Sequence, residues 1–227
     1  IGVEIFKIGS GELTNLPLIE HIAKKNKHMI ISTGMSTIEE IGETVDLVKS
    51  TGTPFALTHC TSVYPCPYEL TNLKVINKLR DLFNVPVGLS DHTSSIYTSF
   101  GAVAHGACLI EKHFTLDKKA EGPDHASSIE PQELSQLVEG SAAIFIANGS
   151  DKKIFEEERQ ILAWARESVV SEKKIFKGET LTNENIWVKR PGPGKYYIPA
   201  KDSKKIIGRK VKYDIPKDTQ IKWDDIS

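Results

Sequence analysis

Apolar and polar positions along the first part of the chain predict strands and helices in turn. Five short apolar runs, each followed by polar or small residues, stand roughly 22 to 31 residues apart, at 5–8, 29–31, 55–58, 85–89 and 108–110. Segments with helical periodicity accompany them, at 16–25, 38–49, 74–82, 97–106 and 131–147. This alternation predicts a parallel sheet covered by helices. A (β/α)8 TIM barrel and an open doubly wound sheet both fit, and no GxGxxG or P-loop motif favours the second.

The pattern changes after residue 147. A charged stretch at 148–167 predicts a partly helical connector. Beyond it, residues 168–227 contain only short β-type runs, at 168–171, 186–188, 211–213 and 220–221, separated by glycine, proline and Asn-Glu-Asn turns. We therefore predict a large domain at 1–147, a connector, and a small β-rich domain at 168–227.

Composition narrows the classes of function. The 29 Lys and Arg residues nearly balance the 30 Asp and Glu residues, so no long-range field favours nucleic acid or an anionic membrane as a partner. Cys60, Cys66 and Cys108 have no CxxC spacing, which disfavours a disulfide framework or structural zinc and indicates a reducing, cytoplasmic setting. No apolar run approaches the length of about 20 residues that a membrane helix needs.

Two histidines follow neighbouring predicted strands. Because strand residues alternate between faces, Ser90 and His92 share one face of the fourth run, and Glu111 and His113 share one face of the fifth. Residues at the C-terminal ends of barrel strands line the active-site mouth. Two imidazoles and a carboxylate at that place suit a divalent metal ion. The alternative is that they are hydrogen-bonded core histidines. That interpretation is the weaker one, because two such histidines follow adjacent strands and a carboxylate lies beside one of them.

A lysine interrupts the first apolar run. Lys7 is costly to bury unless an anion pairs with it, and Ser10 lies just after it in a glycine-rich turn. A phosphate or a carboxylate is the natural partner of such a group. Among other polar residues, His59 and Cys60 are interpreted as supporting the site, and His125 as either a substrate contact or a loop residue.

Six motifs follow one another in the order found in sialic acid, legionaminic acid and pseudaminic acid synthases, which the chain resembles over essentially its whole length. They are Lys-Ile-Gly-Ser-Gly-Glu at 7–12, Ser-Thr-Gly-Met at 32–35, His-Cys-Thr-Ser-Val-Tyr-Pro at 59–65, Gly-Leu-Ser-Asp-His-Thr at 88–93, Ile-Glu-Lys-His-Phe-Thr at 110–115 and Gly-Pro-Asp-His at 122–125. The final domain is similar to the antifreeze-like (SAF) domain of these enzymes, most clearly in Trp-Val-Lys-Arg-Pro-Gly at 187–192.

The resemblance implies a fold and a reaction. The family condenses phosphoenolpyruvate with N-acetylmannosamine or a related acetamido sugar and releases phosphate, as a carbon–carbon bond-forming transferase of carbohydrate biosynthesis. The five runs then match the fourth to eighth strands of a TIM barrel, so that 1–147 is the C-terminal part of the synthase domain. The first three βα units are expected in a longer polypeptide of roughly 330 to 350 residues.

Site residues follow from the same resemblance. His92 and His113 match the metal ligands, with Mn²⁺ or Mg²⁺ as the ion, and Lys7, Ser10 and Ser90 match groups that hold phosphoenolpyruvate.

The sugar is expected to meet other residues. Glu111 matches a contact of the sugar acceptor, and Arg190 matches an arginine that reaches from the SAF domain into the active site of the partner subunit, in a homodimer with exchanged SAF domains. Ser62 stands where some sialic acid synthases carry a substrate-contacting asparagine, which leaves the exact sugar open. Lys7, Glu111 and Arg190 are the candidate catalytic residues.

Two other functions stay open at this point. One is a phosphoenolpyruvate-dependent synthase of the octulosonate type, whose acceptor is a sugar phosphate. The other is a non-catalytic carbohydrate-binding fragment, against which the polar groups at 7, 92, 111 and 113 argue, because a scaffold has no reason to keep them at strand ends.

Overall fold

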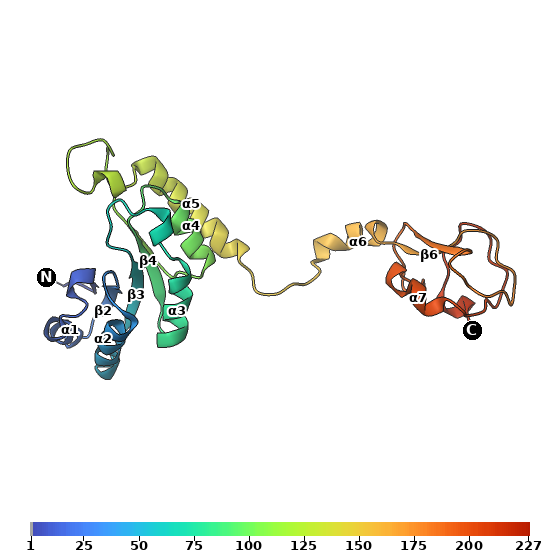
Figure 1. The fold of residues 1–227 in the computed structure, drawn as a ribbon, viewed down its shortest axis with the longest axis horizontal. Coiled ribbons are helices and arrows are strands. Elements are labelled where there is room, and N and C mark those ends of the chain that lie inside the picture. Colours follow the sequence, from blue (N-terminus) through green and yellow to red (C-terminus); the bar gives the residue numbers. More distant parts are fainter. Residues whose placement is uncertain (1) are drawn as a thin grey trace. The chain divides into compact units, whose positions relative to one another are not determined.

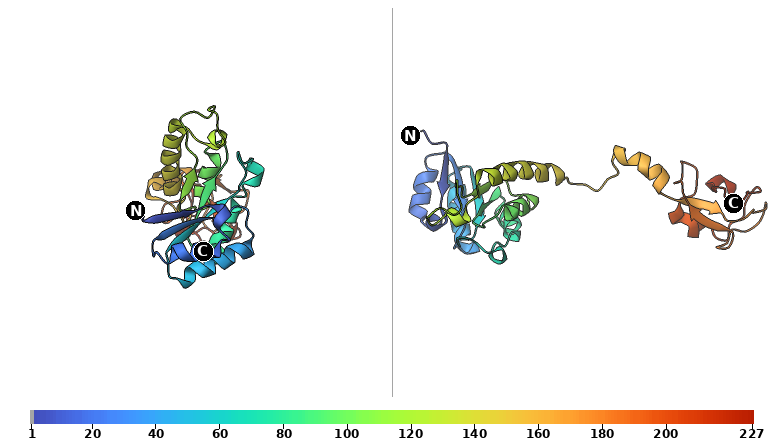
Figure 2. Two further views of the ribbon diagram at one scale, coloured as in Figure 1. Left: turned by 90° about the vertical axis from the view of Figure 1, so that its left-hand side faces the viewer. Right: turned by 90° about the horizontal axis from the view of Figure 1, so that it is seen from above.

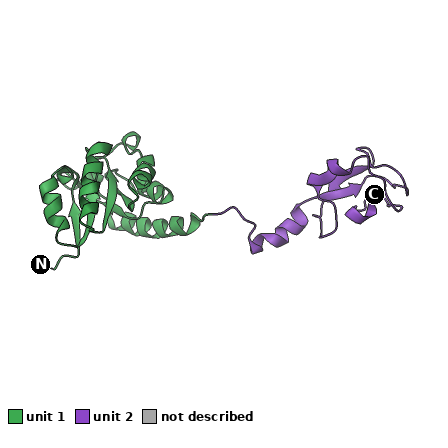
Figure 3. Ribbon diagram, turned by 90° about the horizontal axis from the view of Figure 1, so that it is seen from below, with its two compact units in different colours: residues 1–150 green, residues 151–227 purple. Residues whose placement is uncertain are grey.

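The computed structural model describes residues 2–227, which form two compact units. One unit ends at Ser150 and the other begins at Asp151 (Figure 3). Within 2–227, no helix has both the length and the apolar character needed to span a membrane.

The N-terminal unit is built on one all-parallel sheet in the order β1-β2-β3-β4-β5 (Figure 1). Its strands are β1 (Ile5–Ile8), β2 (His28–Ser32), β3 (Phe55–Cys60), β4 (Val87–Asp91) and β5 (Ile110–Lys112). The helices after them are α1 (Leu16–Ala23), α2 (Ile38–Ser50), α3 (Lys74–Phe83), α4 (Tyr97–Ala104) and α5 (Pro131–Ala147), with 3-10 turns η1 (Ser10–Glu12), η2 (Tyr68–Leu70) and η3 (His125–Ser127). Sequential parallel strands joined by right-handed crossovers place these helices on one face of the sheet, and Figure 2 gives two further views of them.

Because side chains alternate along each strand, the apolar ones pack on one face of the sheet and polar ones project from the other. On the helix-covered face most side chains are apolar and almost fully buried, among them Ile8, Met29, Ile31, Leu57, Val87 and Leu89. Their strand neighbours Lys7, Ser32, Thr58 and Ser90 point to the opposite face. The core therefore lies between sheet and helices, and the other face is free to carry polar groups.

An ion pair shows how strongly the sheet curves. Lys7 lies on edge strand β1 and Glu111 on the opposite edge strand β5, yet Lys7 Nζ is 3.0 Å from Glu111 Oε2. Four strand spacings in a flat sheet would separate these strands by about 19 Å, at about 4.8 Å each. The sheet must therefore curl so that its polar face is concave. The unit is a parallel half-barrel.

The predicted alternation of strands and helices in this unit is confirmed, and each strand and helix predicted before residue 148 overlaps its counterpart in the structure. The five strands that are described form an open arc, so the closed eight-stranded barrel stays a prediction.

The C-terminal unit contains a two-stranded antiparallel sheet, β6 (Ser168–Ser171) with β7 (Ile186–Lys189). Its helices are α6 (Arg159–Ala165) and α7 (Ser203–Ile206), with 3-10 turns η4 (Glu156–Glu158), η5 (Ala200–Asp202) and η6 (Trp223–Asp225). Its core is aliphatic and includes Val169, Ile175, Leu181, Ile198, Ile206 and Ile221. This unit thus has a hydrophobic core of its own.

Two predicted β-runs of this unit are wrong as strands. Residues 211–213 and 220–221 make only the isolated bridges Val211↔Ile226 and Val170↔Gln220. Gly208 and Asp218 adopt positive φ angles close to these runs. The chain turns there before a second ladder pair can form, so apolar spacing alone overstated the strands.

Candidate active site

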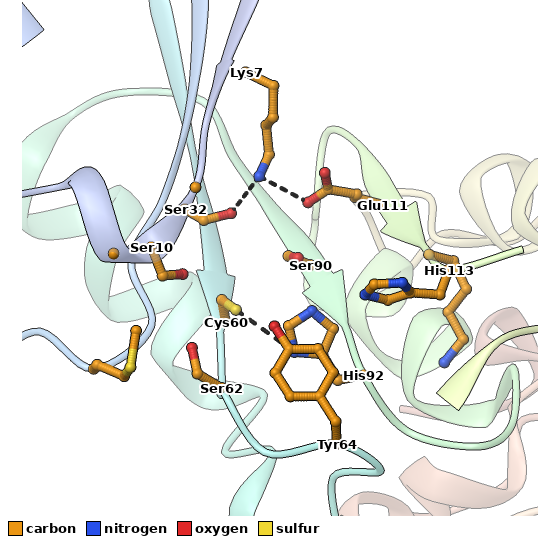
Figure 4. A pocket seen from close by; sticks show the side chains of 14 residues that line it. Lys7, Ser10, Ser32, Cys60, Ser62, Tyr64, Ser90, His92, Glu111 and His113 are labelled. Atoms are coloured by element: carbon orange, nitrogen blue, oxygen red, sulfur yellow. Dashed lines mark hydrogen bonds and ion pairs between the residues drawn. The ribbon is translucent and has the colours of Figure 1, made fainter. Parts of the chain in front are cut away.

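A hollow of about 490 Å³ opens on the concave face of the sheet, at the C-terminal ends of its strands (Figure 4). Seven of the eight residues predicted for the site line it: Lys7, Ser10, Ser62, Ser90, His92, Glu111 and His113. They come from β1, from the segments after β1, β3, β4 and β5, and from β4 and β5 themselves. The eighth, Arg190, belongs to the C-terminal unit and follows β7.

A polar chain crosses the strands beneath this hollow. Lys7 Nζ donates a hydrogen bond to Ser32 Oγ at 2.7 Å, and Ser32 Oγ lies 2.7 Å from Thr58 Oγ1. The contact between Lys7 and Glu111 Oε2 has the distance of an ion pair but not the geometry of a hydrogen bond, and among the described residues this buried oxygen has no hydrogen-bond donor. Glu111 Oε2 therefore has acceptor capacity that no described donor uses.

Gly34 lets two serine side chains approach the backbone closely. A Cβ atom at this position would lie 2.4 Å from Ser62 Oγ and 2.8 Å from Ser10 Oγ, well inside contact distance. The Gly34 amide donates to Ser10 Oγ at 3.0 Å. The Ser10 hydroxyl proton can then be donated to Cys60 or to a ligand, and Ser10 lines the same hollow as the Lys7 ammonium, a combination suited to a phosphate or carboxylate.

The two predicted metal ligands lie next to each other. The rings of His92 and His113 have centroids 5.3 Å apart, and Tyr64 stacks on His92 at 4.0 Å. His92 Nδ1 lies 2.9 Å from the carbonyl oxygen of Thr61, which can only accept, so Nδ1 carries the proton. The other ring nitrogen, Nε2, is then left with its lone pair, as a metal ligand requires.

Within residues 2–227, no three His, Cys, Asp or Glu side chains are placed to hold a metal ion together. The available donors are two imidazoles, with Glu111 lining the same hollow. This set fits a divalent ion that accepts nitrogen and completes its shell with water or substrate oxygens, for which Mn²⁺ is better suited than Mg²⁺.

The His92 ring also affects a thiol. Cys60 Sγ lies 3.9 Å from His92 Nδ1 and, like His92, is buried. Burial opposes ionisation of Cys60, but hydrogen bonds from His92, Ser10 and Ser90 outweigh it and lower the pKa of the thiol. Burial likewise lowers the pKa of His92, and the partners Cys60 and Thr61 outweigh it and raise that pKa.

Behind these residues, on the helix side of the sheet, lies a buried ion pair. Lys112 Nζ is 3.2 Å from Asp91 Oδ1, and the two side chains are 3% and 0% exposed. Asp91 also accepts hydrogen bonds from Thr98 and Ser99, both at 2.6 Å, and from the Thr93 amide at 2.8 Å. Burial opposes ionisation of Asp91, but Lys112 and these donors together lower the pKa of the carboxyl group. For Lys112 the effect of burial is larger than the attraction of Asp91, so the pKa of the ammonium is lowered.

Other polar residues lie away from the hollow. His59 is buried on the helix side and lies 2.7 Å from the carbonyl oxygen of Thr71, so its Nε2 donates there. His125 is hydrogen-bonded within its loop to Thr115 Oγ1 at 2.7 Å. Both contacts agree with a supporting or loop role.

Arg190 is held within its own unit. Its Nε donates to the carbonyl oxygen of Ala165 at 3.1 Å, and its guanidinium lies over Trp164. Gly192 lets the same loop approach α6 closely, because its amide donates to Ala163 O and a Cβ there would lie 2.8 Å from that oxygen.

Sequence reasoning missed Tyr64 and Asp124. Tyr64 lines the hollow, and Asp124 Oδ2 lies 4.0 Å from His113 Nδ1. Both belong to motifs that the sequence offers, at 59–65 and 122–125, but each sits on a loop, where strand alternation makes no prediction. Only the loop conformation brings them to the histidines.

Comparison with known proteins decides the family. The NeuB family model matches residues 1–153, and the SAF domain model matches residues 166–227. The chain belongs to the NeuB family. The resemblance to nonulosonic acid synthases with a C-terminal SAF domain is thereby confirmed.

Relatives within the NeuB family are named synthases. N,N'-diacetyllegionaminic acid synthase of Campylobacter jejuni is 46% identical over 198 residues, which covers 86% of this chain and 59% of that protein. Human N-acetylneuraminate-9-phosphate synthase is 37% identical, over 97% of this chain and 62% of its own length. The crystal structure of sialic acid synthetase from Leptospira borgpetersenii, in complex with citrate, has a TM-score of 0.67 at 37% identity and covers 71% of this chain and 57% of that one. The chain thus spans about three-fifths of these NeuB family relatives.

The buried state of His59 predicts a pH dependence of stability. Burial, opposed by the bond to Thr71, lowers the pKa of His59 below its ordinary value. The unfolded chain therefore binds this proton more readily, so the stability is present above the unfolded pKa of about 6.5 and is lost as the pH falls below it. The free energy of unfolding, measured in urea from pH 7 to pH 5, should fall more steeply for the parent than for His59→Gln. Parallel pH profiles would contradict this assignment.

Proposed function

We propose that the protein containing this chain condenses phosphoenolpyruvate with an unphosphorylated N-acetylmannosamine-type sugar and releases phosphate, as a nonulosonate synthase. The observation that carries the proposal is the convergence of a lysine, three serines, two histidines and a glutamate from four strand ends into one hollow. Membership of the NeuB family, whose relatives are named legionaminic and sialic acid synthases, supports it.

In this proposal different residues of the chain bind the two substrates. Lys7, Ser10 and Ser90 hold the phosphate and carboxylate of phosphoenolpyruvate by charge-assisted hydrogen bonds. Glu111 accepts a hydroxyl of the sugar through the oxygen that has no donor among the described residues. Ser62 lies across the Gly34 gap from this anion site and contacts the acceptor.

The reaction forms a bond between C3 of phosphoenolpyruvate and the aldehyde carbon of the open-chain sugar. Water then adds at C2 of the former enolpyruvate, and the phosphate leaves from that carbon. Holding both substrates in attack geometry is worth roughly 7 to 11 kcal/mol of barrier in favourable cases.

His92 and His113 would hold the divalent ion, Mn²⁺ being the better match to their nitrogens. When bound, such an ion supplies Lewis acidity toward the aldehyde oxygen of the sugar. Thr61 contributes by fixing the tautomer of His92 through its carbonyl oxygen.

Arg190 acts on a neighbouring subunit in this proposal. The SAF unit carries it on a loop fastened to α6, and the residues before α6 form the connector to the half-barrel. In a homodimer with exchanged SAF domains, Arg190 enters the active site of the partner subunit and contacts substrate there.

Phosphate release separates this function from its alternatives. The full-length protein should release phosphate from phosphoenolpyruvate only when Mn²⁺ and an unphosphorylated N-acetylated mannose-type sugar are both present, because both complete the site. Release only with a sugar phosphate would indicate the octulosonate type. No release with either acceptor, under conditions where the sugar binds, would indicate a carbohydrate-binding protein.

Replacing either predicted metal ligand should remove activity without unfolding the protein. His92→Ala and His113→Ala should each lower turnover about a hundredfold or more, because Lewis acidity accounts for several kcal/mol of transition-state stabilisation. Bound manganese and turnover are measured together. His105→Ala is the matched control, because His105 lies at the C-terminal end of α4, away from the hollow, where it contacts Asn77 of α3. Normal manganese affinity in either ligand variant would exclude these ligands.

Subunit mixing tests the placement of Arg190. Arg190→Ala and His113→Ala should each be inactive alone, and a mixture should recover activity, because each heterodimer contains one barrel with both groups intact. A mixture of His92→Ala with His113→Ala is the control and should stay inactive, since every barrel then lacks a ligand. An inactive first mixture, with subunit exchange verified, would place Arg190 in its own subunit or outside the site.

A further inference from the structure

The buried pair Asp91–Lys112 has no part in the reaction described above, yet it lies between the residues that do. Asp91 stands between Ser90 and His92 on β4, and Lys112 stands between Glu111 and His113 on β5. Because strand neighbours point to opposite faces, both side chains are directed to the helix side of the sheet, and Lys112 also borders the hollow.

The pair also joins the two strands at the end of their ladder. Asp91 and Lys112 are partners across the β4–β5 ladder, and theirs is the last registered pair before both histidines. Among the described residues no β4–β5 pair follows it, and the carbonyl oxygens of His92 and His113 accept instead from the amides of Cys66 and Ile129, which belong to separate segments. Lys112 Nζ also donates to the carbonyl oxygen of Thr93, the residue after His92.

Every polar group of this cluster has a partner. The Lys112 ammonium contacts the Asp91 carboxylate, Thr93 O and Thr93 Oγ1, and the carboxylate takes its remaining bonds from α4 and the Thr93 amide. A saturated, almost fully buried network has one low-energy arrangement and resists rotation of the strand ends.

We propose that Asp91 and Lys112 are positioning residues, which hold His92 and His113 at the spacing that a divalent ion requires. This inference rests on the proposed metal centre. Outer partners of metal ligands typically contribute 10- to 100-fold to metal affinity, and here the effect passes through the backbone of the adjoining residues.

The test is manganese affinity in the full-length protein after removal of metal with a chelator. Free Mn²⁺ is followed by its electron paramagnetic resonance signal, and folding by circular dichroism at the same temperature. Lys112→Met should weaken binding about tenfold or more. Because that variant leaves the buried Asp91 charge without its cation, the double variant Asp91→Asn/Lys112→Met is measured beside it. The double variant should stay folded and bind at least tenfold more weakly.

Lys118→Met is the matched control. Lys118 is also paired with a carboxylate, Glu133 at 2.6 Å, and also donates to a carbonyl oxygen after His92, that of Ser94. It lies outside the β4–β5 ladder, so its loss should change manganese affinity less than twofold.

Four results would overturn the inference. A folded double variant with parental affinity would show that the histidines need no such support. Failure of the double variant to fold would assign the pair to stability alone. Equal weakening in Lys118→Met would show that any lost ion pair nearby has the same effect. A parent that binds no Mn²⁺ overturns the proposed metal centre as well, which distinguishes that failure from the others.

Discussion

The rest of the structure depends on the curvature of the parallel sheet, which the ion pair between Lys7 and Glu111 makes evident. This pair joins the first and last strands of a five-stranded sheet at 3.0 Å. Only a curled sheet allows this contact, and curling brings the ends of all five strands to a common centre. Lysine, serine, histidine and glutamate side chains that are distant in sequence then share one hollow without any single loop having to position them.

Strand alternation explains which parts of this arrangement could be predicted. Ser90, His92, Glu111 and His113 were placed by parity alone, since a strand offers two directions and the apolar neighbours occupy one of them. Tyr64 could not be placed in this way, because its position depends on a loop whose course is set by contacts distant in sequence, among them the bond from the Cys66 amide to His92 O. The short apolar run at 211–213 led to a wrong strand prediction, because such a run indicates burial but does not show which segment will pair with it.

The two units form their hydrophobic cores in different ways. The half-barrel buries one face of a sheet beneath helices, whereas the SAF unit has a single two-stranded ladder and packs aliphatic side chains from irregular segments. Its loops are therefore fastened by specific bonds. Ala163 O and Ala165 O of α6 receive the amide of Gly192 and the Nε of Arg190. The Arg190 side chain is thus fixed within the SAF unit, by the hydrogen bond from its Nε and by the stacking of its guanidinium over Trp164.

The two ion pairs of the half-barrel differ in a way that matches their proposed tasks. Lys7 and Glu111 are 35% and 40% exposed, and pairs with such access to water contribute only about 0 to 1 kcal/mol. In the proposed reaction an entering phosphate would take over Lys7 at little cost, which would also free Glu111 for a sugar hydroxyl. Asp91 and Lys112 are sealed from water, and separating them would leave a buried charge unpaired, at a cost of about 3 to 5 kcal/mol. One pair can thus exchange its partner for a ligand, while the other must stay intact for the strand ends to keep their geometry.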